Sequence, residues 1–402
     1  MPWLLSLNEM TTPTPIYLDN AATTRPLETA VAAMEQAHLE WFGNPSSAHD
    51  FSIAPKKALE DAREFLRGTL SAAKLVFTSG GTEADLLGIA GAVQRKSPGR
   101  VLCATSDHPA ILQQSGVLAR TRHKLVPVPT TSDGDIDPEV FFEHLGKDVR
   151  GIAIMHGHNE LGTLGDIEEL TSLARRICPD AHIHVDLVQS YGKIPFDFGS
   201  VDVDSVAIAA HKLHGPRGVG FLAFSNNAEI HPLQPAGGQE LGLRGGTENV
   251  AGAVGLAVAA EAAFTHMAES RAHTETLAGD LFDRLLEAFP DAVRLGDPDH
   301  HLPHILSMRI PGVVGATILK RMDAHGVAFS TGSACHGPND KGNHVHEAIG
   351  LSRREAREVM RVSFCRFNTK EELDRVAKLM KEEVSFLLDH APSSGKEQGQ
   401  AR

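Results

Sequence analysis

A lysine and a carboxylate stand at the ends of two apolar runs, where their side chains could do chemistry together. Lys212 follows the run at residues 205–210 and precedes a Gly/Pro turn, so it lies where a strand ends in a tight loop. Asp186 ends the run at residues 182–186, and a neighbouring strand could bring its carboxylate near Lys212. Pyridoxal 5'-phosphate requires a lysine for a Schiff base and a carboxylate for its pyridinium nitrogen. The pair therefore indicates a pyridoxal phosphate site.

One of the four cysteines lies in a setting that favours reactivity. Cys335 stands in a segment rich in Gly, Pro, Asn and Asp, a composition typical of a loop that moves. A thiol on such a loop, near a pyridoxal lysine, suggests sulfur chemistry. Cys103, Cys178 and Cys365 lie in or beside apolar runs, and we interpret them as packing residues.

Three histidines close to this segment, His336, His344 and His346, raise the alternative of a metal site. No second liganding cluster accompanies them, and solvated loop histidines are more common than ligands. The sequence therefore predicts no metal.

A glycine-rich turn is the candidate phosphate site. Gly80, Gly81 and Thr82 lie between the strand-like run at 75–79 and a helical run at 84–93. Backbone amides at a helix start, aided by the helix dipole, bind phosphate groups well. Many such turns are glycine-rich for packing alone, so the interpretation depends on Asp186 and Lys212 being nearby.

The elements that must position these residues follow an α/β rhythm. Short β-rich runs occur at residues 75–79, 101–104, 151–155, 182–186, 206–209 and 219–224. Between two of them, residues 167–177 have helical spacing, an acidic start and a Cys-Pro end, as in a crossover helix. This alternation predicts a layered α/β domain with a mainly parallel sheet.

The C-terminal part has a different pattern. An Ala-rich helix at 250–289, kinked around Ser270, could join two domains. Strand-like runs follow at 305–310, 327–329 and 359–364, with a clear helix at 370–388. We predict a large α/β domain at residues 26–257, a smaller α+β domain from residues 1–25 and 258–390 that carries the Cys335 loop, and a disordered tail at 391–402.

Composition narrows the class of protein. The 402 residues include 38 basic and 51 acidic side chains, a formal charge of -13 that argues against nucleic-acid or anionic-membrane partners. The scattered cysteines indicate neither a disulfide framework nor a zinc ribbon. Residues 1–7 lack the features of a signal peptide, and no apolar run is long enough to span a bilayer. We therefore expect a soluble, cytoplasmic protein.

The motifs, read in order, resemble a known family. They are the stretches at residues 17–24 (YLDNAATT), 43–49 (GNPSSAH), 80–83 (GGTE), 108, 159–160 (NE), 186–189 (DLVQ), 211–212 (HK), 237–240 (GGQE), 244–249 (RGGTEN), 333–335 (SAC) and 361–363 (RVS). The chain resembles the pyridoxal-phosphate cysteine desulfurases and selenocysteine lyases of aminotransferase class V along nearly its whole length. The resemblance implies a fold-type I pyridoxal-phosphate transferase with a seven-stranded sheet.

The resemblance implies a role for each cofactor contact. Lys212 would hold the cofactor covalently and later move the Cα proton, and Asp186 would keep the ring nitrogen protonated. His108 would stack on the ring and act as acid or base. The expected cofactor-binding residues are Gly81, Thr82, His108, Asn159, Asp186, Gln189, His211, Lys212 and Thr247, with Thr247 supplied by the second subunit of a homodimer.

The resemblance also implies a substrate and a reaction. Arg361 would grip the substrate carboxylate with its planar fork, with Asn159 beside it. Cys335 would attack the substrate sulfur, so that L-cysteine yields L-alanine and a Cys335 persulfide for a sulfur acceptor. Arg361 could instead be a structural ion-pair partner.

Three positions depart from the family's usual pattern. Ala209 stands where a serine is common, Leu187 follows the aspartate in place of a small residue, and His158 replaces an asparagine. Some selenocysteine lyases also lack that serine, so release of selenium from L-selenocysteine is the first alternative. The three departures together motivate a second, a non-catalytic scaffold that binds sulfur-carrier partners.

Overall fold

A seven-stranded sheet forms the centre of the larger part of the molecule. The computed structural model describes residues 14–234, 237–331 and 343–390. Its main strands are β2 (Lys74–Thr78), β3 (Gly99–Ala104), β4 (His123–Val128), β5 (Val149–Met155), β6 (His182–Asp186), β7 (Ser205–Ala209) and β8 (Gly220–Phe224). The order is β2-β8-β7-β6-β5-β3-β4, and every strand except β8 runs in the same direction. The predicted mainly parallel seven-stranded sheet is confirmed.

Alternate residues of the strands face two helical layers. On one face, strand residues such as Leu75, Phe77 and Ile152 share a core with helices α2 (Ile53–Gly68), α7 (Ile167–Ile177) and α8 (Val250–Thr265). On the other face, Val76, Val101 and Ala153 pack against the helix formed by α3 (Gly81–Leu86) and its continuation η2 (Leu87–Gly91), and against α4 (Pro109–Leu112) and α5 (Ser115–Arg120). Strands buried on both faces read as continuous apolar runs, which explains why the sequence revealed them.

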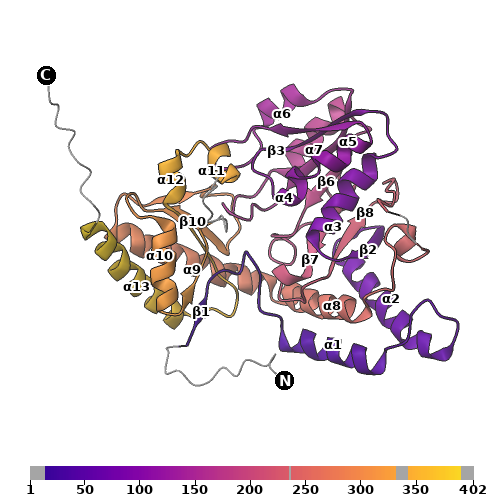
Figure 1. The fold of residues 1–402 in the computed structure, drawn as a ribbon, viewed down its shortest axis with the longest axis horizontal. Helices are drawn as coiled ribbons and strands as arrows, with labels where there is room; N and C mark the ends of the chain where they lie inside the picture. Colours follow the sequence, from indigo (N-terminus) through magenta and orange to yellow (C-terminus); the bar gives the residue numbers. More distant parts are fainter. Residues whose placement is uncertain (1–13, 235–236, 332–342, 391–402) are drawn as a thin grey trace.

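A second core lies among the C-terminal elements. These are α9 (Met267–Ala288), β9 (Val293–Leu295), β10 (Ile305–Arg309), α10 (Gly315–Ala324), β11 (Val327–Ala328), α11 (His344–Ala348), α12 (Arg353–Arg357), β12 (Val359–Ser363) and α13 (Lys370–Asp389). Strands β12, β10 and β9 form an antiparallel sheet, and β1 (Ile16–Tyr17) returns from the N-terminal side to pair with β11. Figure 1 shows this orange-to-yellow part beside the larger part, with α9 in the former and α8 in the latter. The remaining helices α1 (Glu28–Glu40) and α6 (Pro138–His144) flank the larger part.

Two details differ from the sequence interpretation. The long helix breaks at His266, where α8 and α9 meet at a bend of 72°, and not around Ser270. Strand β4 was not predicted, because Pro127 and the charged Lys124 interrupt its apolar pattern. The strand lies at the edge of the sheet, where a proline without a backbone N–H is tolerated.

Among the described helices, none by itself combines the length and the apolar character of a membrane span; α8 and α9 meet that test only as a pair, across their bend. The predicted tail at 391–402 and the Cys335 segment lie outside the described residues.

Candidate active site

The candidate cofactor residues gather at the carboxyl ends of the parallel strands of the large sheet. Thr82, His108, Asn159, Asp186 and Lys212 each lie at or just after the carboxyl end of a strand, in the order β2, β3, β5, β6 and β7. These strands are parallel to one another, so their carboxyl ends meet at the same edge. That edge is where open α/β sheets bind their ligands.

Lys212 ends the short 3-10 turn η3 (Ala210–Lys212) that follows β7. Its Nζ donates hydrogen bonds to the carbonyl oxygens of Ala21 (2.6 Å) and Ala22 (2.8 Å), and Gln189 Nε2 donates to the same Ala21 oxygen (2.8 Å). Burial, followed by the positive charge of Arg361, lowers the pKa of Lys212 to about 8. The amine can therefore lose its proton near neutral pH more readily than a solvated lysine.

Asp186 is almost fully buried at the end of β6. Its Oδ1 accepts a hydrogen bond from the Val188 amide at 2.8 Å. Burial raises the pKa of this carboxyl well above its usual value, the nearby carboxylate of Asp85 raises it further, and Lys212 opposes the shift. Asp186 and Lys212 each shift the pKa of the other, so the structure brings the two groups into one electrostatic environment.

His108 caps the first turn of α4. Its Nδ1 accepts a hydrogen bond from the Ala110 amide at 3.1 Å, which places the ring proton on Nε2. Burial lowers the pKa of His108 to about 4, helped by the charges of Lys212 and His344. The neutral ring thus keeps an Nε2–H donor close to the lysine.

His211 has a related environment. Its Nδ1 lies 3.2 Å from the Thr23 hydroxyl, and burial followed by the charge of Lys212 lowers its pKa to about 4. The turn that carries both residues is tied to the N-terminal segment, because Thr24 Oγ1 donates to the His211 carbonyl oxygen at 2.9 Å.

The glycine-rich turn after β2 leads directly into α3. A Cβ on Gly81 would lie 2.7 Å from Val188 Cγ2, so only glycine fits between the turn and the segment after Asp186. Thr82 is exposed on the first turn of the helix. The next residue, Glu83, forms an ion pair with Arg244 (3.3 Å). The first turn of α3 presents its backbone amides at the same sheet edge as Lys212.

A buried ion pair holds the strand that carries this turn. Glu240 accepts two hydrogen bonds from Arg63, at 2.7 and 2.9 Å, and a third from the Phe77 amide at 2.7 Å. The segment that follows Glu240 carries Thr247, which is exposed. Within this single chain, no described hydrogen bond or ion pair joins Thr247 to the other candidate residues.

Arg361 projects from β12 and is almost fully buried. Its Nη2 lies 2.8 Å from Asp19 Oδ1, and its Nη1 donates to the carbonyl oxygen of Asn159 at 2.8 Å. Arg361 therefore forms an ion pair within the chain, as the structural alternative expected, because Asp19 is its carboxylate partner. Arg361 Nε, Asn159 Oδ1 and Gln189 Oε1 are buried and have no hydrogen-bond partner among the described residues. Buried polar atoms of this kind fit a polar ligand that binds between them.

Three positions differ from the usual pattern of the family, and the structure shows that two of them pack in the core and the third holds a turn. Ala209 and Leu187 are fully buried in strand and turn. His158 Nδ1 accepts hydrogen bonds from the backbone amides of Glu160 (3.1 Å) and Leu161 (3.2 Å). Its Nε2 forms a hydrogen bond with the carbonyl oxygen of Ser106 at 3.1 Å. The histidine therefore shapes the turn behind Asn159, a role that the sequence did not suggest.

Sequence reasoning also missed partners that hold the predicted residues. Asp19, Thr23 and the carbonyl oxygens of Ala21 and Ala22 all come from the 17–24 motif, whose position in the sequence was noted without a role for each residue. Cys335 and His336 lie outside the described residues. Within the described ranges, no group of three or more His, Cys, Asp or Glu side chains could hold a metal ion.

Comparison with known proteins identifies the family. The family model described as aminotransferase class-V matches residues 16–376, which is most of the chain. The chain belongs to the aminotransferase class-V family. It is 36% identical over 383 residues to "Cysteine desulfurase NifS" of Azotobacter vinelandii, covering 94% of each protein. It is 35% identical to "Cysteine desulfurase IscS" of Dictyoglomus turgidum, covering 94% of this chain and 96% of the relative.

Solved structures agree with this assignment. A structure named "NIFS-LIKE PROTEIN" superposes with a TM-score of 0.86 at 33% identity, covering 92% of this chain and 100% of the other. A second, "SspA in complex with cysteine", gives 0.75 at 30% identity, covering 88% and 100%. The expected class-V resemblance and the α/β fold are confirmed.

Proposed function

We propose that this protein is a pyridoxal-phosphate-dependent cysteine desulfurase that converts L-cysteine to L-alanine and places the sulfur on Cys335. The single observation that carries the proposal is the meeting of Lys212 and Asp186 at the carboxyl edge of the sheet, beside buried polar atoms that lack partners. The cysteine desulfurase names of the class-V relatives support the choice of reaction.

The side chains at this edge fit pyridoxal phosphate in kind and position. Lys212 would carry it, Asp186 would pair with its ring nitrogen, and Gln189 would use its amide group on the ring oxygen. His108 and Asn159 would border the ring, and the phosphate would meet the first turn of α3 at Gly81 and Thr82, with His211 beside it. When bound, the cofactor supplies an aldehyde for attachment and an electron-accepting ring that makes loss of the Cα proton possible.

Lys212 is suited to proton transfer because its lowered pKa lets the ammonium lose its proton readily. With its pKa at about 8, the free amine can take a proton from the substrate Cα and return it elsewhere. The carbonyl oxygens of Ala21 and Ala22 hold Nζ while it is not otherwise engaged. His108, neutral and with its proton on Nε2, can donate to or accept from the same region.

Arg361 and Asn159 would bind the substrate carboxylate. Two of the five N–H groups of the guanidinium are used by Asp19 and the Asn159 carbonyl, which leaves Nε and two others for the ligand. Asp19 fixes the plane of the fork and keeps the positive charge in a buried site. The structure named "SspA in complex with cysteine" supports cysteine as the substrate class.

The assignment of Cys335 rests on the sequence. Its thiolate would attack the substrate sulfur, so that the C–S bond of cysteine breaks, an S–S bond to Cys335 forms, and the carbon skeleton leaves as alanine after it gains a proton. The persulfide would then pass to the thiol of an acceptor protein. This exchange needs no external oxidant, because the two electrons lost when the two sulfurs join are gained by the substrate β-carbon, whose C–S bond is replaced by a C–H bond in alanine.

We also propose a homodimer. Phe42, Phe51 and Ile53 form an exposed apolar patch around η1 (Asp50–Ser52), with about two thirds of each side chain open to solvent. Phe42 and Phe51 lie with ring centroids 5.8 Å apart, and Ser46 reaches Glu248 of the segment that carries Thr247 (3.4 Å). Burial of this patch by a second subunit would bring Thr247 to a phosphate site in the partner chain.

The domain division is also a proposal. One core cluster is built from residues between Leu59 and Ala260, and another from Ile16, Leu18 and residues between Leu277 and Val384. These clusters support a large domain at 26–257 and a small one from 1–25 and 258–390.

The free, buried thiols of Cys103 and Cys178 suit a reducing, cytoplasmic environment.

The test is incubation of the holoenzyme with L-cysteine, with alanine measured in solution and the Cys335 peptide examined by mass spectrometry. We expect alanine and a peptide heavier by one sulfur. Lys212→Ala should abolish alanine formation, and Cys335→Ala should abolish the persulfide. Competition with L-selenocysteine decides between the two substrates. A protein that holds no cofactor after reconstitution would instead be a scaffold.

A further inference from the structure

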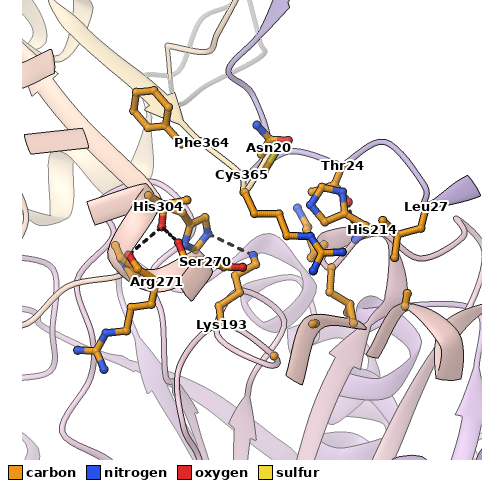
Figure 2. Close-up of a pocket in the computed structure, with 18 residues that line it drawn as sticks. Asn20, Thr24, Leu27, Lys193, His214, Ser270, Arg271, His304, Phe364 and Cys365 are labelled. Atoms are coloured by element: carbon orange, nitrogen blue, oxygen red, sulfur yellow. Dashed lines mark hydrogen bonds between the residues drawn. The ribbon is translucent and has the colours of Figure 1, made fainter. Parts of the chain in front are cut away.

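A second cavity lies behind Lys212, between the two cores of the molecule. It has a volume of about 60 Å³ and lies between α8, α9, the turn after Asp186 and the residues that follow β12. Figure 2 shows its wall, with the Lys193 amine joined to the His304 ring by a dashed line. Of the residues assigned above to cofactor and substrate, only Lys212 lines it, so most of this wall has no role in the proposed site.

The charged groups of this wall are all basic. Lys193, Lys212, Arg271 and Arg366 contribute to the lining, and none of the described lining residues is Asp or Glu. In Figure 2 the guanidinium of Arg271 turns away, whereas the Lys193 amine points toward His304. A cationic cavity without a carboxylate is unexpected in a chain with a formal charge of -13. It favours an anion as the occupant.

His304 supplies an unused donor in the same wall. Lys193 Nζ lies 3.2 Å from His304 Nε2; when the amine is protonated it can only donate, so that Nε2 accepts and the ring proton is on Nδ1. His304 is 4% exposed, and its Nδ1 has no hydrogen-bond partner among the described residues. Burial, then the charge of Lys212, lowers the pKa of Lys193 to about 7. A buried N–H without an acceptor, next to a lysine that has no carboxylate partner in the wall, fits an anionic ligand.

Apolar side chains make up much of the remaining lining, namely Leu27, Leu213, Ala259, Ala263 and Phe364, and the uncharged polar residues Asn20, Thr24, Ser270 and Thr274 also contribute. A water-sized group needs about 10–15 Å³ of such volume, so the space accommodates roughly four to six non-hydrogen atoms. A halide would leave most of the apolar wall uncovered, and phosphate would place charged oxygens against that wall. A carboxylate with a short hydrocarbon chain satisfies both ends.

We propose that this cavity is a binding site for a short-chain monocarboxylate, with one carboxylate oxygen accepting from His304 Nδ1 and Lys193 fixing the ring from its other side. The hydrocarbon chain lies against Ala259 and Ala263 of α8. The site spans the bend between α8 and α9, so its occupant contacts both cores and stabilises their relative position. The site requires no turnover and shares only Lys212 with the function proposed above.

The experiment is calorimetric titration of the holoenzyme with acetate, propionate, butyrate and hexanoate at constant ionic strength. We expect saturable binding that is tightest for propionate or butyrate, at least tenfold weaker for hexanoate, and absent for butyramide and butylamine. Sodium chloride up to the same concentrations should not displace butyrate. Displacement by chloride, or an affinity that does not depend on chain length, would overturn the carboxylate assignment.

Variants separate this cavity from the substrate site. Lys193→Met removes the cation, Ala263→Leu fills the apolar end, and each should weaken butyrate binding at least tenfold. Lys96→Met is the matched control, since Lys96 is another lysine with a lowered pKa that donates to one carbonyl oxygen, and it should bind butyrate normally. Arg361→Gln should also leave butyrate binding unchanged. If Arg361→Gln abolishes binding and Ala263→Leu does not, butyrate occupies the substrate site and the inference is wrong.

Discussion

Replacement of Arg361 by glutamine tests whether its fork binds the substrate carboxylate. The guanidinium is buried, so its hydrogen bonds are little weakened by water, and three of its N–H groups are free for a ligand. Two charge-assisted bonds of about 1.5–3 kcal/mol each give about 3–6 kcal/mol, or roughly a hundredfold to ten-thousandfold in kcat/KM at 1.4 kcal/mol per tenfold. The loss should fall mainly on KM, because the carboxylate is bound before and during the reaction.

The assay is alanine formation from L-cysteine by the holoenzyme over a range of substrate concentrations. Arg361→Lys keeps the charge but not the planar fork, and its kcat/KM should lie between those of Arg361→Gln and the parent protein. Arg309→Gln is the matched control. Arg309, on neighbouring β10, pairs with Glu355 (3.1 Å) and Glu358 (3.2 Å), so its loss also breaks ion pairs in the same sheet.

The control should lower the unfolding temperature without changing KM. If Arg361→Gln folds normally and keeps kcat/KM within tenfold of the parent protein, the arginine is a structural partner of Asp19 and the substrate carboxylate binds elsewhere.

Three further predictions concern the residues that hold the site. Glu240→Gln leaves Arg63 without its buried partner and should lower the free energy of unfolding by about 3 kcal/mol, as measured by urea denaturation. A loss below about 1 kcal/mol would show that the ion pair does not stabilise the fold. Burial lowers the pKa of His158 to about 4, so between pH 6.5 and 4 the unfolded chain binds a proton at this residue that the folded chain excludes. The contribution of His158 to stability should therefore fall as pH falls, by up to about 1.4 kcal/mol per unit, and His158→Gln should remove one proton from the total slope. Gly81→Ala should lower the unfolding temperature and the retention of cofactor, because the added methyl group contacts Val188. Val188→Ala in the same chain should restore both. A double variant no better than the single variant would show that this contact is not the cause.

Much of the sheet could be predicted because its strands are buried on both faces. Runs such as 182–186 and 206–209 are apolar throughout and end at turn residues, and they differ from β6 and β7 by at most one residue at either end. Edge strand β4 lacks that signal, because only one neighbour pairs with it and its pattern includes Lys124 and Pro127. The break at His266 is set by packing, since α8 belongs to one core and α9 to the other, and no Gly or Pro marks it.

The site was predictable where residues close a strand, and not where they meet across the chain. Asp186 and Lys212 stand at strand ends, and their proximity follows from neighbouring parallel strands. The pairing of Arg361 with Asp19 joins residues 342 positions apart, and the contact of Lys193 with His304 joins residues 111 apart. Such contacts depend on how the two cores come together, which local patterns do not report.

The antiparallel strand β8 has a consequence for biosynthesis. Strand β2, which leads into the phosphate turn, pairs with β8 and with no other strand of the described sheet, and β8 is the last of the seven to be made. While the ribosome is still translating the segments before β8, β2 has no hydrogen-bonded neighbour, although β3 to β7 can already pair. The proposed cofactor pocket therefore closes late in synthesis, and a nascent chain truncated before Gly220 should have five paired strands, β3 to β7, but should not retain the coenzyme.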